Sequence, residues 1–335
     1  MTPSPGPAIV LTAGLGRRLL PLTYCRAKPA VPVAGTPLIC RTLSWLASEG
    51  VRDAVLNLHY RPETIAAVVG DGSDLGIRVR YTWEPLILGS AGGPRRALSV
   101  LDSPRVLIIN GDTLTNVDLN EMVAAHERTS ARVTLAVVPS QDPRRYGGVL
   151  ADEHGRVRGF TRAGHPEPCY HFIGVQVVDT EVFRDLPDGR PAATIGGLYS
   201  SLVTQDDSAL HAHVVSAAFR DIGTPADYLK TSLALAHEEG LDRLLIGRGT
   251  FVDPTARLIR TVLWDEVVVE RDCELTECVI GDRVRVPSGC RFEGRAIVAA
   301  ESHHMAGSER VGDLLVAPLS TRGPDARTKG TALRL

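Results

Sequence analysis

The regular alternation of short β-branched runs with amphipathic stretches, from Ala8 to about Ser140, constrains the fold of this chain more than any other feature. The apolar runs predict strands over residues 8–12, 54–58, 77–83, 106–110 and 133–138. The amphipathic stretches predict helices over residues 36–48, 62–69, 90–101 and 118–128, the first with Thr36-Pro37 as its cap and first turn. This alternation is typical of an α/β fold. We expect a Rossmann-like, doubly wound, mostly parallel sheet whose ligands bind beyond the carboxyl ends of its strands.

The sequence pattern changes after Gly247. Apolar positions then recur about every five to six residues between Asp, Gly and Pro, which predicts a short C-terminal left-handed parallel β-helix of about two or three coils. We therefore expect a catalytic domain over residues 1–245, the β-helix over 246–300 and a loosely attached tail over 301–335. The β-helix is expected to pack subunits together in a homo-oligomer.

The composition excludes several classes of protein. With 335 residues, 44% of them hydrophobic, and a formal net charge of −2, the chain is neither disordered nor collagen-like. Because its charges balance, a nucleic-acid partner is not expected, and an anionic ligand must be met by a local cluster of cations. The six cysteines include no C-x-x-C pair, which argues against a zinc site or a disulfide framework. Neither a signal peptide nor a long apolar run occurs, so we expect a cytoplasmic protein with no membrane partner.

The segment from Ala13 to Gly35 is a long connection between a predicted strand and a predicted helix, where about two to six residues are usual. It contains no acidic residue but four cations, Arg17, Arg18, Arg26 and Lys28. Gly14 and Gly16 would let backbone N–H groups approach a ligand closely, so the segment predicts a cradle for a triphosphate. A Rossmann dinucleotide turn is one alternative, although it needs a third glycine where Leu19 stands. A plain surface loop is another.

Two stretches at this segment are distinctive: Leu11 to Thr23 reads LTAGLGRRLLPLT, and Ala27 to Leu38 reads AKPAVPVAGTPL. They resemble the signature of the sugar-1-phosphate nucleotidyltransferases, with the nearest likeness to members of the mannose-1-phosphate guanylyltransferase type. The resemblance implies that Arg18 holds the triphosphate and stabilises the leaving pyrophosphate, and that Lys28 reaches the α-phosphate and the sugar phosphate. The nucleotide contacts expected from this part of the chain are those of Leu11, Ala13, Gly14, Gly16 and Arg17. Relatives usually have Thr or Ser where Arg17 stands.

Two aspartates are candidate magnesium ligands. Asn110-Gly111-Asp112 follows a predicted strand, which places the Asp112 carboxylate at the carboxyl edge of the sheet, with a plain turn as the alternative interpretation. Asp221 opens the run Asp221-Ile-Gly-Thr-Pro225, before a helix predicted over residues 225–237, and the resemblance implies a second magnesium ligand there. Carboxylate oxygens suit Mg²⁺ bound to phosphates. We expect Asp112 and Asp221 to hold Mg²⁺ and Asn110 to lie beside the nucleotide.

The run Glu84-Pro-Leu-Ile-Leu-Gly-Ser-Ala-Gly92 resembles the base-recognition segment of the same family. The backbone of Gly89 and Ser90 would face the base and ribose. A carboxylate at Glu84 can accept two N–H groups, as on the guanine edge, whereas thymidylyl- and uridylyl-transferring relatives commonly have glutamine there. This favours GTP, while an exposed Glu84 with no role in binding remains an alternative.

Three further motifs resemble the sugar side of the family's site. Tyr146-Gly-Gly-Val149 would bring Gly147 close to the hexose, and Phe172-Ile-Gly174 would contribute Gly174. Phe160-Thr-Arg162 stands where relatives carry a Glu-Lys pair, so Arg162 could replace the lysine as a phosphate partner while the carboxylate is missing. The sugar is therefore open among mannose, glucose, a heptose and a cyclitol analogue.

The expected reaction is the transfer of a nucleotidyl group from a nucleoside triphosphate, GTP favoured, to a sugar 1-phosphate, with Arg18, Lys28 and Asp112 as catalytic residues and Mg²⁺ as cofactor. A member that transfers uridylyl, thymidylyl, adenylyl or cytidylyl to a different phosphate is one alternative. A catalytically silent regulatory or scaffold paralogue is another. Acyl transfer by the β-helix is disfavoured because residues 247–293 contain no histidine.

Overall fold

The computed structural model describes residues 5–140, 147–165, 168–241, 245–301, 303 and 305–319. The chain divides into two compact units. The first, called the sheet unit here, comprises Met1–Gly14 and Leu38–Arg220, and the second, called the β-helix unit, comprises Leu15–Pro37 and Asp221–Leu335. Residues 15–37, which contain the four cations and are called the cationic segment, therefore belong with the β-helix. This division does not coincide with the domain boundary expected at residue 245.

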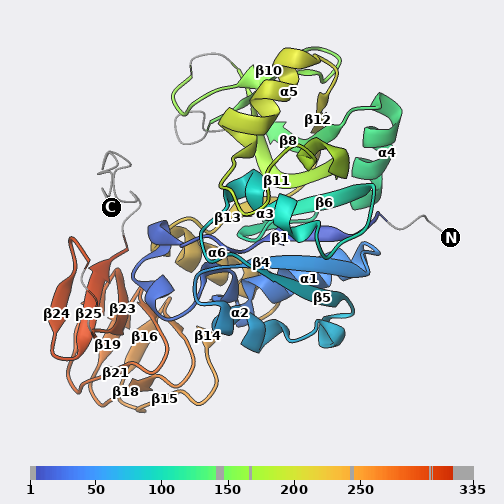
Figure 1. Ribbon diagram of the computed structural model, residues 1–335. Helices are drawn as coiled ribbons and strands as arrows, with labels where there is room; N and C mark the ends of the chain where they lie inside the picture. The colour runs from blue at the N-terminus through green and yellow to red at the C-terminus, as the bar shows by residue number, and fades with distance from the viewer. Residues whose placement is uncertain are drawn as a thin grey trace, which may run out of the picture. The chain divides into compact units, whose positions relative to one another are not determined.

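The sheet unit contains a mixed nine-stranded sheet with a parallel core (Figure 1). Its main path runs β10-β9-β11-β6-β1-β4-β5, and β8 pairs with both β11 and β12. β4, β1 and β6 are parallel neighbours, whereas β11 is antiparallel to β6 and β8. The strands are β1 (Ala8–Leu11), β4 (Asp53–Leu58), β5 (Arg78–Trp83), β6 (Arg105–Asn110), β8 (Val133–Pro139), β9 (Val149–Ala151), β10 (Val157–Phe160), β11 (Tyr170–Asp179) and β12 (Leu210–Val214).

Five α-helices connect these strands in the described part of the sheet unit: α1 (Leu38–Ser48), α2 (Pro62–Val69), α3 (Gly89–Ala97), α4 (Leu119–Thr129) and α5 (Tyr199–Gln205). Helix α2 has its predicted bounds. Helix α4 begins after Asp118, whose carboxylate accepts hydrogen bonds from the backbone N–H groups of Asn120 and Glu121, so Asp118 is its N-cap. β7 (Thr113–Thr115) pairs with β13 (Phe219–Asp221), where the chain passes into the second unit.

The strand order reverses at β1, and this reversal determines where a ligand can bind. The chain proceeds from β1 to β4 and β5 on one side, then returns to place β6 on the other side of β1. Ile9, Val55 and Ile108 are fully buried, as the near-continuous apolar runs of a doubly covered parallel sheet require. In such sheets the crevice beyond the carboxyl ends of the strands at the reversal is the usual ligand site.

The β-helix unit is built from three ladders of short parallel strands (Figure 1). Equivalent positions in successive coils are 17 residues apart, as for Thr255 and Asp272, so each of three sides takes between five and six residues, as the sequence spacing predicts. The elements are β2 (Pro32–Val33), β3 (Thr36–Pro37), α6 (Pro225–Glu238), β14 (Leu245–Ile246), β15 (Phe251–Val252), β16 (Arg257–Ile259), β17 (Val262–Leu263), β18 (Val268–Val269), β19 (Glu274–Thr276), β20 (Val279–Ile280), β21 (Arg285–Val286), β22 (Arg291–Glu293), β23 (Arg295–Ala299), β24 (Glu309–Val311) and β25 (Leu314–Pro318).

Two expectations need correction in this unit. Thr36-Pro37 is not the start of a helix, because it pairs antiparallel with Pro32-Val33 as a small hairpin. The segment expected to be a loose tail after residue 300 is partly ordered, since β25 pairs antiparallel with both β23 and β24. The physical reason is the apolar run of β25, in which Leu314 to Ala317 are buried. Among the described residues, no helix is long and apolar enough to cross a bilayer.

Candidate active site

The carboxyl ends of β1 and β6 meet as the sequence predicts. Leu11 and Asn110 are paired in register, and the Gly111 N–H donates to the Leu11 carbonyl over 3.0 Å. Gly174, at a φ of +81°, lies against Asn110 so closely that a Cβ there would be 2.8 Å from the Asn110 side chain. Asp112 follows in the half-buried turn between β6 and β7. The structure thus groups Leu11, Asn110, Asp112 and Gly174 at the ligand edge of the sheet.

A buried polar chain links the neighbouring strands at this edge. The Thr12 N–H donates to Asn57 Oδ1 over 2.8 Å, and the Thr12 hydroxyl donates to the Asn57 carbonyl. Asn57 Nδ2 in turn donates to Glu84 Oε1 over 2.6 Å. The other carboxylate oxygen of Glu84, Oε2, accepts the Leu88 N–H over 2.8 Å. Glu84 is 0% exposed, so its charge is satisfied inside the protein.

This geometry corrects the expectation that the Glu84 carboxylate faces a base, because the side chain is fully buried and its oxygens accept protein hydrogen bonds. Asn57, which sequence reasoning missed, is the partner that holds it. A signal was present: Asn57 interrupts the otherwise apolar run of β4. A buried asparagine in such a strand needs hydrogen-bond partners, and the carboxylate that directly follows the next strand supplies one.

Gly89 and Ser90 are the first residues of helix α3, where their backbone could face a base as expected. Gly89 has a φ of +76°, and a Cβ there would lie 2.7 Å from the Ala192 carbonyl oxygen, so only glycine fits. The Ser90 hydroxyl is engaged with Thr194, whose N–H donates to it over 2.9 Å. Within the described residues, the backbone N–H groups of Gly89 and Ser90 donate to no protein acceptor, so they are available to a ligand at this helix start.

Two of the expected sugar-side residues lie side by side at one end of the β9–β10 hairpin. The position of a Gly147 Cβ would be 2.5 Å from the Thr161 carbonyl oxygen and 3.8 Å from Arg162 Cα. Arg162 is exposed. Tyr146, the first residue of that motif, lies outside the described residues.

The β-helix unit contains the expected phosphate residues around one turn at Gly16. Gly16 has a φ of +62°, and a Cβ there would lie 2.7 Å from Thr23 Cγ2 and 3.2 Å from Lys28 Cβ. Arg17 and Arg18 follow directly in a short 3₁₀ helix, Arg17–Leu19, and both are exposed, whereas Lys28 is 7% exposed. Arg18 and Lys28 therefore border the same turn. Gly14, at the end of the sheet unit, has no described atom within 4 Å of its Cβ position.

Asp221 lies near Arg18 at the start of helix α6. A Cβ at Gly223 would be 3.0 Å from Asp221 Oδ2, 3.2 Å from Arg18 Nη1 and 3.3 Å from Asp227 Oδ2. Asp227 and Thr224 form the capping box of α6, so Asp221 is not needed as its cap. This arrangement leaves Asp221 and Arg18 together at a helix start, with a glycine between them that gives both side chains room.

Arg26, expected among the phosphate-binding cations, has another role. Its guanidinium donates to both carboxylate oxygens of Asp282, each over 2.6 Å, and to Asp265 over 2.7 Å. The side chains are only 14%, 15% and 25% exposed respectively. A cation committed to two carboxylates in this way is not available to a triphosphate, so the expected set of four loop cations reduces to Arg17, Arg18 and Lys28.

The two carboxylates of the expected metal site fit magnesium. In the part of the chain that the structure describes, no group of three or more His, Cys, Asp or Glu side chains is placed to hold an ion. Magnesium needs no such protein cage, because it is commonly bound by one or two carboxylates together with substrate phosphates and water. Asp112 in the sheet unit and Asp221 in the β-helix unit are carboxylates of the kind required.

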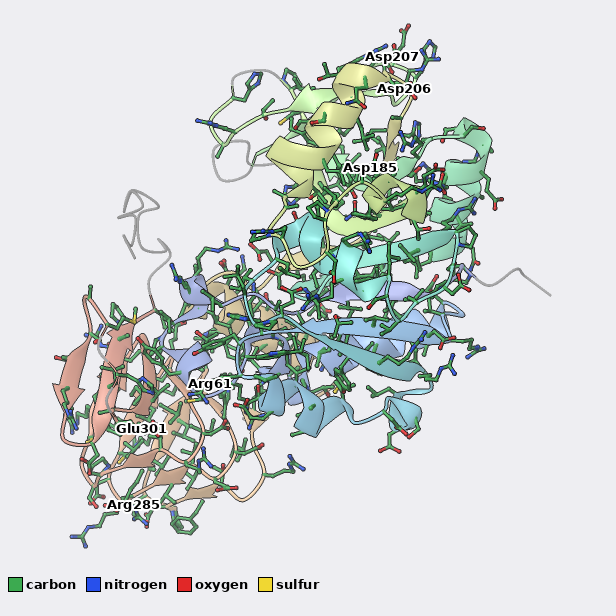
Figure 2. All side chains as sticks on the ribbon, in the orientation of Figure 1. Arg61, Asp185, Asp206, Asp207, Arg285 and Glu301 are labelled. Atoms are coloured by element: carbon green, nitrogen blue, oxygen red, sulfur yellow. The ribbon has the colours of Figure 1, made fainter. Side chains whose placement is uncertain are left out.

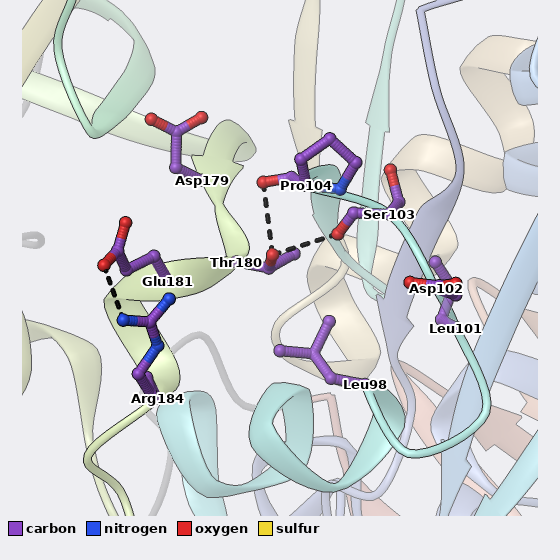
Figure 3. A pocket seen from close by; sticks show the side chains of 9 residues that line it. All are labelled: Leu98, Leu101, Asp102, Ser103, Pro104, Asp179, Thr180, Glu181 and Arg184. Atoms are coloured by element: carbon purple, nitrogen blue, oxygen red, sulfur yellow. Dashed lines mark hydrogen bonds and ion pairs between the residues drawn. The ribbon is translucent and has the colours of Figure 1, made fainter.

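A separate hollow of about 600 Å³ lies at the opposite edge of the sheet (Figure 3). It lies beside Pro104, which precedes β6, and Asp179, which ends the antiparallel β11. Thr180 donates to the Ser103 and Pro104 carbonyls, and Glu181 pairs with Arg184 over 2.9 Å, so these groups bind one another. Because it lies at the amino ends of the parallel strands, this hollow is distinct from the candidate active site.

Comparisons with known proteins show what this chain is similar to. A model of the family described as nucleotidyl transferase matches residues 7–238. The mannose-1-phosphate guanylyltransferase of Mycobacterium tuberculosis is 33% identical over 85% of this chain and 82% of its own length. The UTP–glucose-1-phosphate uridylyltransferase of Synechocystis is 25% identical over 96% and 85%. The crystal structure of HddC from Yersinia pseudotuberculosis has the same fold, with a TM-score of 0.60 at 23% identity, over 69% of this chain and 99% of that one.

Proposed function

The chain belongs to the nucleotidyl transferase family, and on that premise we propose that it transfers a guanylyl group from GTP to a sugar 1-phosphate, giving a GDP-sugar and pyrophosphate. The observation that carries the proposal is the turn at Gly16, where Lys28 packs against the glycine and Arg18 follows it. Two cations that border the same turn suit a triphosphate.

The proposed reaction is a direct displacement. An oxygen of the sugar phosphate attacks the α-phosphorus in line, the bond between that phosphorus and the α–β bridging oxygen breaks, and pyrophosphate leaves with the electron pair. Arg18 stabilises the charge that develops on the leaving pyrophosphate, and Lys28 orients the α-phosphate and the incoming sugar phosphate. Arg17 adds positive charge beside them. Mg²⁺, when bound by Asp112 and Asp221, supplies neutralisation of the phosphate charge.

GTP is favoured over the other nucleotides because the relative that is 33% identical over 85% of this chain is a guanylyltransferase. The base would be read by the backbone of Gly89 and Ser90 at the start of α3, with the ribose and phosphates beside Leu11, Ala13, Gly14 and Asn110. Glu84 would act behind this surface, by holding the Leu88 N–H and therefore the approach to the helix. The similarity to a uridylyltransferase makes UTP the main competitor.

The sugar phosphate would lie on the other side of the sheet reversal, near Gly174, Gly147 and Arg162. Gly174 provides a close backbone approach next to Asn110, and Arg162 provides an exposed cation for a phosphate. These residues fit a sugar 1-phosphate as a class, and mannose 1-phosphate is the first member to test.

The experiment incubates the purified protein and Mg²⁺ with each of five nucleoside triphosphates, GTP, UTP, dTTP, ATP and CTP, against a panel of sugar 1-phosphates, and measures pyrophosphate and the mass of the nucleotide sugar. GTP with one sugar 1-phosphate is expected to give the highest kcat/KM, and Arg18→Ala is expected to lower it by about 100-fold. Arg291→Ala, an exposed arginine of the β-helix, serves as the matched control. Highest activity with another base would refute the guanylyl assignment, and no product with any pair would favour a catalytically silent paralogue.

A further inference from the structure

The cationic segment is attached to the β-helix at three consecutive residues of its own unit. Tyr24 stacks on His303 with ring centroids 4.0 Å apart and an angle of 2° between the rings. The Cys25 sulfur lies 2.8 Å from the position that a Cβ at Gly281 would occupy, so only glycine lets the segment approach this closely. Arg26 makes the third attachment, and it is the strongest because it combines charge with hydrogen bonds.

Arg26 binds two successive coils of the β-helix at once. Its Nε and one Nη donate to the two oxygens of Asp282 in a bidentate pair, and the same Nη reaches Asp265, 17 residues earlier in the chain. Burial alone would lower the pKa of Arg26, but the hydrogen bonds and charges of Asp282 and Asp265 outweigh it and raise the pKa above its ordinary value. The guanidinium is therefore held as a fixed cation in a half-buried site.

The attachment continues through aromatic side chains to the far end of the segment. Arg26 lies over the ring of Trp264 at 5.6 Å, and the Trp264 indole N–H donates to the Tyr228 hydroxyl over 2.8 Å. The Tyr228 hydroxyl donates in turn to the Pro32 carbonyl. Tyr228 and Trp264 are both fully buried. The chain is therefore held on both sides of Lys28 by the pair of Trp264 and Tyr228: Arg26 before Lys28 contacts Trp264, and Pro32 after it accepts from Tyr228.

We propose that Arg26 is a positioning residue for the phosphate site, and that the β-helix, through Asp265 and Asp282, holds the segment in the conformation that presents Arg18 and Lys28 to the triphosphate. The inference rests on the proposed function of that segment. A connection this long, whose regular elements are short 3₁₀ turns and a small hairpin, would otherwise sample many conformations. The cations would then meet the nucleotide in only a fraction of them. The β-helix is in this view a part of the active-site support as well as an appended domain.

The test compares Arg26→Lys and Asp282→Asn with Arg285→Ala in the full-length protein. Arg285 pairs with Glu270 on the outer face of the same β-helix, over 2.8 Å and with 66% of its side chain exposed, so it is a matched charged-pair control (Figure 2). Arg26→Lys keeps the charge but loses the bidentate pair. Both test variants are expected to raise the KM for the nucleotide and lower kcat/KM by about 10- to 100-fold, as small misplacements of binding groups do. The control variant is expected to keep the wild-type values.

A second measurement separates positioning from global damage and from failure of the proposed function. Amide hydrogen exchange should become faster over residues 15–37 in both test variants while the strands of the β-helix keep their protection. Combining Arg26→Ala with Asp282→Ala should lower kcat/KM by less than the product of the two single effects, because the two side chains bind each other. Unchanged exchange over residues 15–37 would overturn the proposal whether or not the wild type is active. Faster exchange with unchanged nucleotide KM and kcat would overturn the positioning role, and an inactive wild type would refute the proposed function alone.

Discussion

Asn57 Nδ2 on strand β4 donates over 2.6 Å to Oε1 of Glu84, the buried residue that follows strand β5. Asn57 cannot turn its amide around, because its oxygen accepts the Thr12 N–H over 2.8 Å. Glu84 therefore receives one donor from Asn57 and a second from the Leu88 N–H. Two donors facing one side chain call for two acceptor oxygens, which a carboxylate has and a carboxamide does not.

We expect Glu84→Gln to destabilise the protein by about 1–3 kcal/mol, because the new NH₂ group would face a donor and leave a buried polar group unsatisfied. Urea unfolding checks this, with Glu63→Gln, whose side chain is 65% exposed, as the control that should change little. The ratio of kcat/KM for GTP over UTP should stay the same. A changed base preference in a variant of unchanged stability would mean that the carboxylate reads the base after all.

Gly93 of helix α3 packs against the hydrogen bond between Asn57 and Glu84. A Cβ at this position would lie 2.7 Å from Asn57 Nδ2 and 2.8 Å from Glu84 Oε1, closer than packed atoms tolerate. Gly93→Ala is therefore expected to lower the free energy of unfolding by about 1–3 kcal/mol through overpacking. Gly159→Ala is the control, since no described atom lies within 4 Å of its Cβ position. Equal stability of the two variants would contradict the packing described for α3.

The sequence was sufficient for features that depend on local pattern. The apolar run before Asn110-Gly111-Asp112 predicted the strand and its edge, and the proline and glycine around residues 62–70 predicted the bounds of α2. The recurrence of apolar positions after Gly247 predicted the β-helix and the number of residues on each of its sides. Each of these features follows from the periodicity of neighbouring residues, so no distant partner had to be known.

Features that depend on distant partners were not predictable in the same way. Arg26 looked like one more loop cation, and its role as a structural link became visible only with Asp265 and Asp282, which are 239 and 256 residues away in the chain. Glu84 looked like a base-reading carboxylate because its partner Asn57 is on another strand. In both cases the sequence showed a charged side chain that needs a partner. It could not show whether that partner is the substrate or another part of the protein.

Asp112, which lies in a half-buried turn, stays a predicted magnesium ligand. Asp112→Asn should lower kcat by about two to three orders of magnitude, as removal of one electrostatic contact to a transition state commonly does. Urea unfolding of the same variant separates a loss of catalysis from a loss of the fold. The variant should also require more Mg²⁺ for half-maximal activity. Asp102→Asn, beside the hollow of Figure 3, is the control, and a wild-type magnesium titration for Asp112→Asn would contradict the assignment.

His126 gives the sheet unit a pH-dependent stability. It is 2% exposed, and its two ring nitrogens lie 2.9 Å from the Thr134 hydroxyl and 3.1 Å from Asp179 Oδ1. Burial lowers the pKa of His126, only partly offset by Asp179, and burial also lowers the pKa of His211. The unfolded chain then binds protons, near its ordinary pKa of about 6.5, that the folded chain does not. The free energy of unfolding is therefore highest above about pH 6.5, where both states are neutral at these histidines. It decreases as the pH falls from there toward the lowered pKa of the folded state.

Urea unfolding between pH 8 and pH 5 should accordingly show a midpoint that falls with acidification in the wild type. In His126→Gln the midpoint at pH 8 should be lower, because the bonds to Thr134 and Asp179 are weakened, but its fall between pH 6.5 and pH 5 should be smaller. A residual slope should remain, since His211 contributes with the same sign. His154→Gln removes an imidazole that is 71% exposed and is the control. An unchanged slope in His126→Gln would show that the buried imidazole does not carry this dependence, and the linkage would then have to be sought at His211.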